Sequence, residues 1–196
     1  MAKRTQKERS EKTTEKVLAT AEKHFAELGY AGVSTDALVQ EVELTRGALY
    51  HHFGSKQGLF EAVAERVQRR VAAAIERETA ATDDPWQGFL AGCFAWLDAV
   101  TERAPQRILL IDAPAVLGWE RWLALDARHG SKLLREGIEE LVAANLIEVE
   151  SKDALLHLLN GAMNQAALWV AQSAQPERTL EEVRGTLGRV LEGLKT

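Results

Sequence analysis

The sequence contains a single cysteine, Cys93, among its 196 residues. A disulfide within one chain is therefore excluded, and the reducing cytoplasm is the simplest setting for the protein. The residues around Cys93, GFLAGCFAWL, are apolar, so we expect a buried small hydrophobe rather than a reactive thiol. The N-terminal residues MAKRTQKERSEK lack the apolar segment of a signal peptide.

Proline is also scarce, with four residues, and no stretch alternates polar and apolar residues over the length of a strand. Alanine, leucine and glutamate, which favour helices, are abundant. Apolar residues recur at helical spacing along most of the chain. The sequence therefore predicts an all-α protein of about nine helices, and its 46% of hydrophobic residues can build a sizeable core.

The segment 154–176 contains no formally charged residue, so a membrane span has to be considered. Six of its side chains would be costly in lipid, namely His157, Asn160, Asn164, Gln165, Gln172 and Gln175. We therefore expect no membrane partner, and a helix buried within protein.

The net charge of −5 is unevenly distributed. Residues 1–56 hold nine Lys and Arg against eight Asp and Glu, whereas residues 57–196 hold 15 against 21. The basic residues near the N-terminus include Lys3, Arg4, Lys7 and Arg9. A basic arm on an acidic protein suggests a local anionic partner, and a solvated, frayed terminus is the alternative.

Residues 35–53, TDALVQEVELTRGALYHHF, have the pattern of two short helices joined by a tight turn at Glu43 and Leu44. Each helix has one small apolar stripe, which must pack on a neighbour. The outer face of the second helix carries hydrogen-bonding groups on an element that fits the DNA major groove. This pattern is typical of a helix-turn-helix with a recognition helix. The outer residues are Thr45, Arg46, Tyr50, His51 and His52.

The run GYAGVSTDALVQEVELTRGALYHHFGSKQGLF, residues 29–60, resembles the DNA-binding domain of the tetracycline-repressor-like (TetR) family of bacterial transcription regulators. One departure is Glu43, because helix-turn-helix motifs usually have glycine at this turn position, where the backbone adopts a positive φ. A non-glycine residue there carries a strain of about 1 kcal/mol.

The resemblance implies which residues contact DNA. Arg46 is the best candidate for base readout, because its guanidinium can pair with both acceptors of guanine. Asp36 would repel a nearby phosphate. Taken alone, Tyr50 could be a half-buried tyrosine, and the two histidines could be a polar face. Adjacent histidines on a helix cannot share one face, so a metal site formed by these two is improbable. The implied contacts are Thr35, Thr45, Arg46, Gly47, Tyr50, His51 and Lys56.

The expected division is a DNA-binding domain over residues 1–55 and an effector-binding and dimerisation domain over residues 56–196. A helix over about 56–79 is long enough to leave the head and enter the second domain. Further helices are expected over 106–113, 118–145 and 151–176. The capping-box spacing of Thr179 and Glu182 predicts the start of the last helix.

A short reading helix contacts only a few bases, so a two-fold dimer on a palindrome is expected. The resemblance implies a four-helix bundle made of the last two helices of each chain; completion of the monomer core is the alternative. The expected interface residues are Gly161, Ala162, Ala166, Leu187, Val190 and Leu191.

Five tryptophans beyond residue 85, with scattered polar groups in apolar helices, suggest a ligand cavity. Tryptophans that fill the core, and amides that bond across an interface, are the alternative. The candidate lining residues are Trp86, Phe89, Trp96, Asp112, Trp119, Trp122, His157, Asn160 and Asn164.

The sequence therefore predicts a cytoplasmic, homodimeric regulator, most simply a repressor, with a double-stranded DNA operator and a small-molecule effector as partners. No cofactor is expected. A helical enzyme is the weaker hypothesis, because no paired-carboxylate, nucleophile-base or metal-ligand spacing stands out. A protein-interaction module that retains the helix-turn-helix head is a further alternative.

Overall fold

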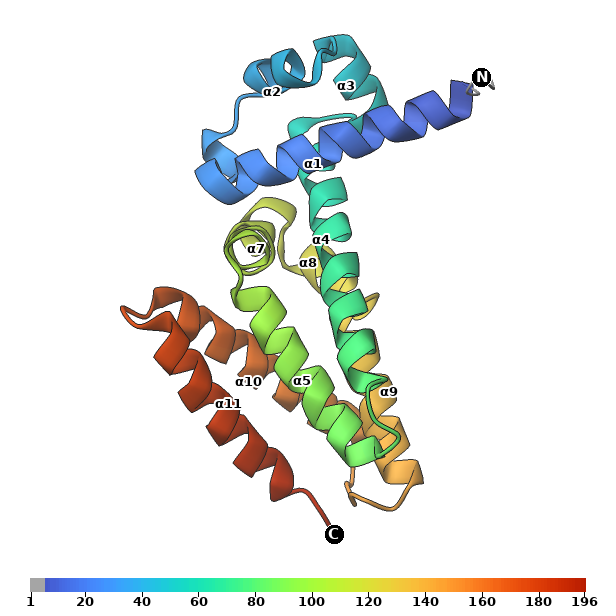
Figure 1. Ribbon diagram of the computed structural model, residues 1–196, viewed down its shortest axis with the longest axis vertical. Helices are drawn as coiled ribbons and strands as arrows, with labels where there is room; N and C mark the ends of the chain where they lie inside the picture. Colours follow the sequence, from blue (N-terminus) through green and yellow to red (C-terminus); the bar gives the residue numbers. More distant parts are fainter. Residues whose placement is uncertain (1–5) are drawn as a thin grey trace.

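A computed structural model describes residues 6–196, and these form helices joined by short connections (Figure 1). The prediction of an all-α protein is confirmed; within the described residues the sole β-type contact is an isolated bridge between Ile147 and Lys195. The elements are α1 (Gln6–Gly32), α2 (Thr35–Val42), α3 (Arg46–Phe53), α4 (Lys56–Thr79), α5 (Pro85–Thr101), α6 (Arg103–Pro105), the π-helix η1 (Gln106–Asp112), α7 (Ala113–Leu117), α8 (Trp119–Ala127), α9 (Gly130–Ala143), α10 (Lys152–Gln172) and α11 (Pro176–Glu192).

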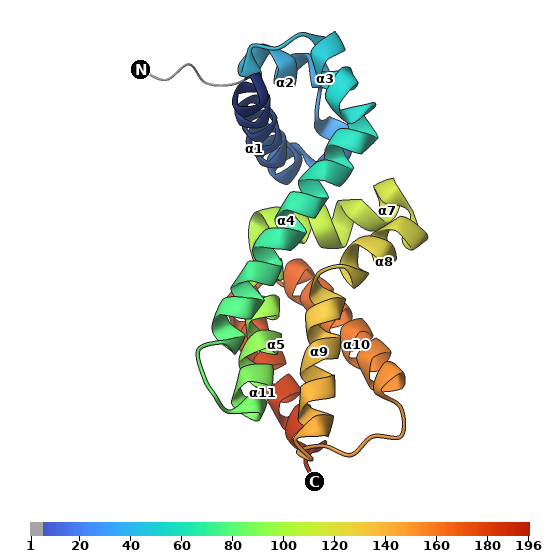
Figure 2. The ribbon, with the colours of Figure 1, turned by 90° about the vertical axis from the view of Figure 1, so that its right-hand side faces the viewer.

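The helices α1, α2 and α3 form a head at one end of an elongated molecule (Figures 1 and 2). The long helix α4 begins in the head and runs down into a body built from α5, α9, α10 and α11. The short helices α7 and α8 lie against the middle of α4. The expected long helix over 56–79 is therefore confirmed, and it physically links the two ends.

The apolar side of α4 is buried along its length. Leu59, Val63, Val67, Val71 and Ile75 are each at most 7% exposed, as their near-heptad spacing predicts. The helix α4 packs with α1 at the head end and with α5 in the body (Figures 1 and 2). All five residues belong to one continuous cluster of buried side chains.

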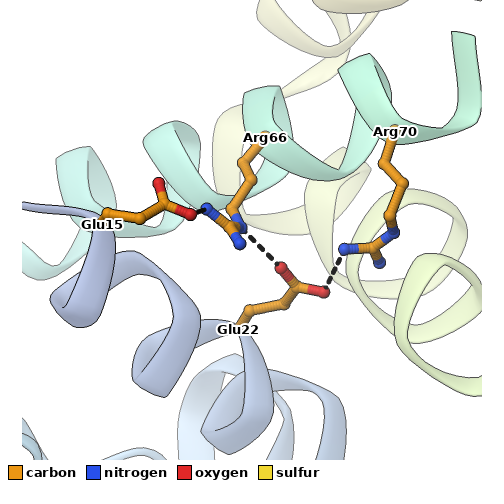
Figure 3. Close-up of polar contacts among 4 residues, drawn as sticks. All are labelled: Glu15, Glu22, Arg66 and Arg70. Carbon is orange, nitrogen blue, oxygen red and sulfur yellow. Dashed lines mark hydrogen bonds and ion pairs between the residues drawn. The ribbon is translucent and has the colours of Figure 1, made fainter. Parts of the chain in front are cut away.

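Two arginines on the side of α4 hold α1 in place (Figure 3). The carboxylate of Glu22, whose side chain is only 13% exposed, accepts from Arg66 Nε at 3.1 Å and from Arg70 Nη1 at 2.7 Å. Glu15, two turns earlier on α1, accepts from the same Arg66. Since these charges are partly shielded from water, their attraction is stronger than in an open surface pair.

A second attachment joins the end of α1 to η1. Asp112 accepts a hydrogen bond from the backbone N–H of Tyr30 at 2.7 Å and forms an ion pair with Arg107 at 3.1 Å. At the junction Gly29 adopts φ +68°, a conformation open to glycine, and this breaks the α-helical path. The buried carboxylate of Asp112 therefore fixes the head against the body.

Two expected helices have different limits. The helix predicted over 118–145 is two helices, because His129 adopts φ −129° and ψ −97°, outside the helical region. The last helix begins at Pro176, with proline in its first turn. Thr179 is therefore inside the helix, where its hydroxyl donates to the Gln175 carbonyl at 3.0 Å. The capping-box pattern with Glu182 was a coincidence of spacing.

The substitution Glu22→Ala is expected to lower the free energy of unfolding by about 1–2 kcal/mol, because Arg66 and Arg70 lose a shared, partly buried partner. The measurement is urea unfolding followed by circular dichroism. Glu27→Ala is the matched control, since Glu27 is an exposed glutamate on the same helix. Equal destabilisation by both variants would contradict the assigned role of Glu22.

Candidate functional site

The turn between α2 and α3 has the geometry of a helix-turn-helix despite its glutamate. Glu43 adopts φ +59° and ψ +42°, the left-handed conformation that glycine would take without strain. The backbone N–H of Leu44 then bonds to the Val39 carbonyl at 2.9 Å. Thr45 caps α3 by accepting from the backbone N–H of Ala48 at 3.2 Å. The departure at Glu43 therefore leaves the turn intact.

The helix α3 is anchored by one face and open on the other. Leu49 is 1% exposed and packs in the head, whereas Arg46, Gly47, His51 and His52 are exposed. Each of the last two turns of α3 thus presents polar groups outward, and no other element in the described chain covers them. A protruding helix with a polar outer face is the shape that enters a major groove.

The outer face of α3 is linked to the start of α2. Arg46 Nη1 lies 3.4 Å from Asp36 Oδ1, and the guanidinium carbon lies 5.8 Å from the centre of the Tyr50 ring. The Tyr50 hydroxyl in turn lies 3.4 Å from the Thr35 hydroxyl. This hydrogen bond with Thr35, followed by contact with Arg46, lowers the pKa of the Tyr50 phenol. Asp36 therefore has a partner that the sequence pattern did not reveal.

The remaining predicted DNA-contact side chains border the same face. Thr35 is 8% exposed, so its hydroxyl is mostly enclosed while its position at the start of α2 still offers backbone N–H groups. Lys56 Nζ lies 4.6 Å from the centre of the Tyr30 ring. The contribution expected from Lys3 and Arg4 lies outside the described residues. Lys7 and Arg9 belong to α1, and the structure does not describe their side chains.

A cavity of about 300 Å³ lies in the body between α4, α5, α9 and α10. This volume is at the lower end of the range for small-molecule sites. Apolar and aromatic side chains form most of the wall, including Ile75, Phe89, Trp96, Leu133, Leu134 and Met163. The polar lining groups are Glu76, Thr79, Glu136, Glu140 and Asn160.

Three of the nine side chains proposed as cavity lining are part of this wall, namely Phe89, Trp96 and Asn160. Asn164 is not a lining residue but donates to the side-chain oxygen of Asn160, which is one, at 2.8 Å. Trp122 is buried and donates from its indole nitrogen to the Leu109 carbonyl at 3.0 Å. These two therefore shape the surroundings rather than the cavity itself.

The four others also lie outside the cavity, each for a physical reason. Asp112 is occupied by the attachment to α1 described above. Trp86 is buried elsewhere, with Lys195 Nζ 4.5 Å from its ring centre. Trp119 is 64% exposed, and His157 is exposed on the outer side of α10. Of the four tryptophans expected to line the cavity, Trp96 alone does so, because a tryptophan can equally fill the core or lie on the surface.

A buried carboxylate behind the cavity wall was missed by sequence analysis. Asp126 is 6% exposed and accepts from Gln68 at 3.5 Å, from Asn160 at 3.1 Å and from Ser131. These residues come from α4, α8, α9 and α10, so their convergence has no local sequence signal. Glu136 and Glu140, also missed, lie four residues apart on one face of α9 and both line the cavity.

The proposed dimer residues on α10 and α11 differ in exposure. Gly161, Ala162 and Val190 are exposed, and Ala166 and Leu187 are half-buried. Leu191 is 0% exposed, which places it in the core of its own chain and corrects its assignment to an interface.

Two large apolar residues of α10 that the sequence analysis did not select, Leu158 and Trp169, are 71% and 53% exposed. The helix expected to be buried is therefore open on one side. Within residues 6–196, no helix is both long and apolar enough to cross a membrane, and no three His, Cys, Asp or Glu residues gather as metal ligands.

Comparisons with known proteins agree on one family. The model of the tetracyclin-repressor-like C-terminal domain matches residues 86–194, and the model of bacterial regulatory proteins of the tetR family matches residues 17–63. The crystal structure of a TetR-family transcriptional regulator from Pectobacterium atrosepticum is 36% identical, covers 98% of both chains, and has a TM-score of 0.82.

Two curated relatives align with this chain over very different lengths. The transposon Tn10 TetC protein of Escherichia coli is 24% identical over 95% of this chain and 90% of its own. An HTH-type transcriptional repressor of Mycobacterium tuberculosis is 40% identical over 32% of this chain and 33% of its own. The higher identity over the shorter alignment indicates that the similarity to this repressor is concentrated in one part of the chain.

Cys93, which lines the cavity, gives a pH-dependent prediction. Burial raises the pKa of its thiol from the ordinary value of 9.0 to about 12. The folded chain therefore keeps this proton to higher pH than the unfolded chain, and stability falls as pH rises above 9. The slope approaches about 1.4 kcal/mol per pH unit well above pH 9, so the loss between pH 8 and pH 10 is about 1.4 kcal/mol. Urea unfolding at pH 8 and pH 10 measures it.

The control is Cys93→Ala, which retains every other group that titrates in this pH range. The wild type is expected to lose about 1.4 kcal/mol more than this variant between pH 8 and pH 10. An identical loss in both proteins would show that the thiol is not protected by burial.

Proposed function

From the premise that this chain belongs to the TetR family of bacterial regulatory proteins, we infer that it is a DNA-binding transcriptional regulator and acts as a ligand-responsive repressor. The observation that carries the inference is the exposed polar face of α3, anchored from behind by the buried Leu49. The proposal assigns the chain no catalytic activity and places its action in the cytoplasm, where its DNA partner lies.

The proposed reading residues lie on or beside α3. Arg46 reads a guanine with its two-pronged guanidinium, and Thr45 contacts a neighbouring base edge. Gly47 adds no side chain, so the backbone can approach the groove. Tyr50 and His51 contact phosphate oxygens, which fix the register of the helix without carrying sequence information. The remaining proposed phosphate contacts are Thr35, through the start of α2, and Lys56, through the start of α4.

The Asp36 carboxylate has a defined place in this proposal. Its Oδ1 lies 3.4 Å from Arg46 Nη1, so base readout requires Arg46 to leave or share this partner. The Asp36 carboxylate repels a phosphate that approaches Arg46, whereas a guanine presents two neutral acceptors to it. Asp36 therefore favours specific over nonspecific binding.

The proposed assembly is a homodimer formed through α10 and α11. The exposed Leu158, Ala162, Trp169 and Val190 support it, because two helices that leave such side chains in water gain free energy by covering them. We accordingly divide the chain into a DNA-binding domain over residues 1–55 and an effector-binding and dimerisation domain over residues 56–196. Two heads at fixed separation then match a palindromic operator.

The effector is proposed to act through the cavity in the body. It must bind the two states of the dimer with different affinity, since equal affinity would shift no equilibrium. The wall of the cavity includes α4, which also carries the head, so any ligand that moves the lower half of α4 changes the position of α3.

The central prediction concerns DNA from beside the gene for this protein. A fluorescence anisotropy titration is expected to detect salt-sensitive binding to a palindrome there, and Arg46→Ala is expected to weaken it by about 10–100-fold because a bidentate base contact is worth about 1–3 kcal/mol. The control Arg69→Ala removes the same charge from an exposed position on α4. Absence of selective binding by the folded wild type would contradict the proposed function.

A second variant tests the role proposed for the Asp36 carboxylate in base readout by Arg46. Asp36→Asn retains Arg46 but removes its ion pair, so nonspecific DNA is expected to bind more tightly while the preference for the palindrome decreases. If the protein were only an interaction module with a helix-turn-helix head, none of these substitutions would change DNA binding.

The dimer prediction is tested by Trp169→Glu, which puts a charge on the exposed apolar face of α10. Sedimentation is expected to show a dimer for the wild type and a substantially larger monomer fraction for this variant. Trp119→Glu is the matched control, because Trp119 is 64% exposed but lies on α8. A wild type that sediments as a monomer, or equal dissociation of both variants, would contradict the interface on α10 and α11.

A further inference from the structure

The charged groups that line the cavity all have the same sign. Glu76 on α4 and Glu136 and Glu140 on α9 are lining residues, and no Lys or Arg belongs to the wall within the described chain. All three side chains are exposed, so they stand at the mouth of the cavity rather than at its floor. An entering ligand therefore passes carboxylates before it reaches the apolar wall.

Two of these carboxylates have no protein partner. Glu136 lies 3.5 Å from Lys132, one turn earlier on α9. Neither Glu76 nor Glu140 makes a side-chain hydrogen bond or an ion pair with any residue of the described part of the chain. Two negative charges at one mouth repel each other, and a cation between them would remove this repulsion.

A third carboxylate lies behind the wall. Asp126 receives hydrogen bonds from Gln68, Ser131 and Asn160, all of them neutral donors, and no cation in the described chain pairs with it. It is close to the cavity, because a Cβ added to the lining residue Gly130 would lie 3.3 Å from Asp126 Oδ1. The donors left at the wall, the indole N–H of Trp96 and the Thr79 hydroxyl, are neutral, so the described wall offers an anionic ligand no cationic partner.

The apolar part of the wall has the shape and chemistry to hold an organic body. Phe89 and Trp96 present aromatic rings, whose faces attract cations. Close helix packing is possible because Gly92 and Gly137 lack side chains: an added Cβ would lie 2.7 Å from Thr79 Oγ1 and from Phe89 Cδ2, respectively. The cavity thus combines an aromatic floor with an anionic mouth.

We propose that the cavity binds a small organic cation with an apolar or aromatic body, whose charge is held by Glu76 and Glu140. The inference rests on the proposed function, of which this cavity is the effector site. Burying the apolar body supplies the affinity, and the carboxylates select the charge. An anion of the same shape is repelled at the mouth, and a neutral molecule of the same shape gains only the apolar part.

The test compares three probes of similar size that differ in charge: phenyltrimethylammonium, its neutral isostere tert-butylbenzene, and benzenesulfonate. Binding to the full-length protein is followed by the fluorescence of its tryptophans, since Trp96 lines the cavity. The cation is expected to bind at least tenfold more tightly than the neutral probe, and the anion is expected not to bind. Added salt should weaken binding of the cation only.

Substitutions at the two glutamates test whether they select for a positively charged ligand. Glu140→Gln is expected to weaken the cation about tenfold and leave tert-butylbenzene unchanged, and Glu76→Gln on a different helix should do the same. Glu139→Gln is the matched control, because Glu139 is the neighbouring exposed glutamate on α9 and is not part of the wall. Glu140→Lys should bind benzenesulfonate in place of the cation.

Equal binding of the cation and its neutral isostere, an equal effect of Glu139→Gln and Glu140→Gln, or failure of all three probes to bind would overturn the proposal. Operator binding without ligand is measured on the same samples. If it is normal while the probes fail, the ligand class is wrong and the regulator stands; if it is absent from the folded wild type, the proposed function itself is wrong.

Discussion

The position of the head depends on the continuity of α4. This helix contributes Leu59 to the core of the head and Ile75 to the wall of the cavity, with buried side chains at every turn between them. A helix packed along its whole length cannot bend in the middle without exposing apolar surface. The two ends of the molecule therefore move as parts of one rod, and the ion pairs of Glu22 with Arg66 and Arg70 fix the angle at which α1 crosses it.

A second connection runs beside α4 through buried polar groups. Asn160 in the cavity wall bonds to Asp126 on α8, and Trp122, one turn earlier on α8, donates to the Leu109 carbonyl of η1. At the end of η1, Asp112 holds the backbone of Tyr30. Each of these groups would be left unsatisfied if its neighbour moved alone, which costs more than moving together. The cavity and the head are thus joined by two parallel mechanical links.

The sequence predicted much of this arrangement where the relevant physics is local. The stripe of α4, the left-handed backbone at Glu43 and the burial of Cys93 all follow from residues within a few positions of each other. The open face of α3 was predictable for the same reason. The break in the helix at His129 was not predictable, because no residue before Gly130 in this segment is a strong helix-stop signal.

The cavity could be predicted only in part, because its wall is assembled from four helices that are distant in sequence. Aromatic residues were a poor guide: Trp96 faces the cavity, Trp119 faces water and Trp86 lies under Lys195. The buried partner of Asn160, Asp126, has an ordinary position on an amphipathic helix. Side-chain direction in such cases is set by tertiary packing, which no single window of sequence contains.

The π-helix η1 has a consequence for how this chain tolerates insertions and deletions. Its wider turn, closed by the bond from the Ala113 N–H to the Ile108 carbonyl, contains one residue more than an α-helical turn would. Removing a single residue from this segment would convert the wide turn into an α-helical one and leave the helical residues on either side facing as before. The segment therefore absorbs a one-residue deletion locally. The same deletion within α4, a regular α-helix, would instead rotate the buried stripe beyond it by about 100°.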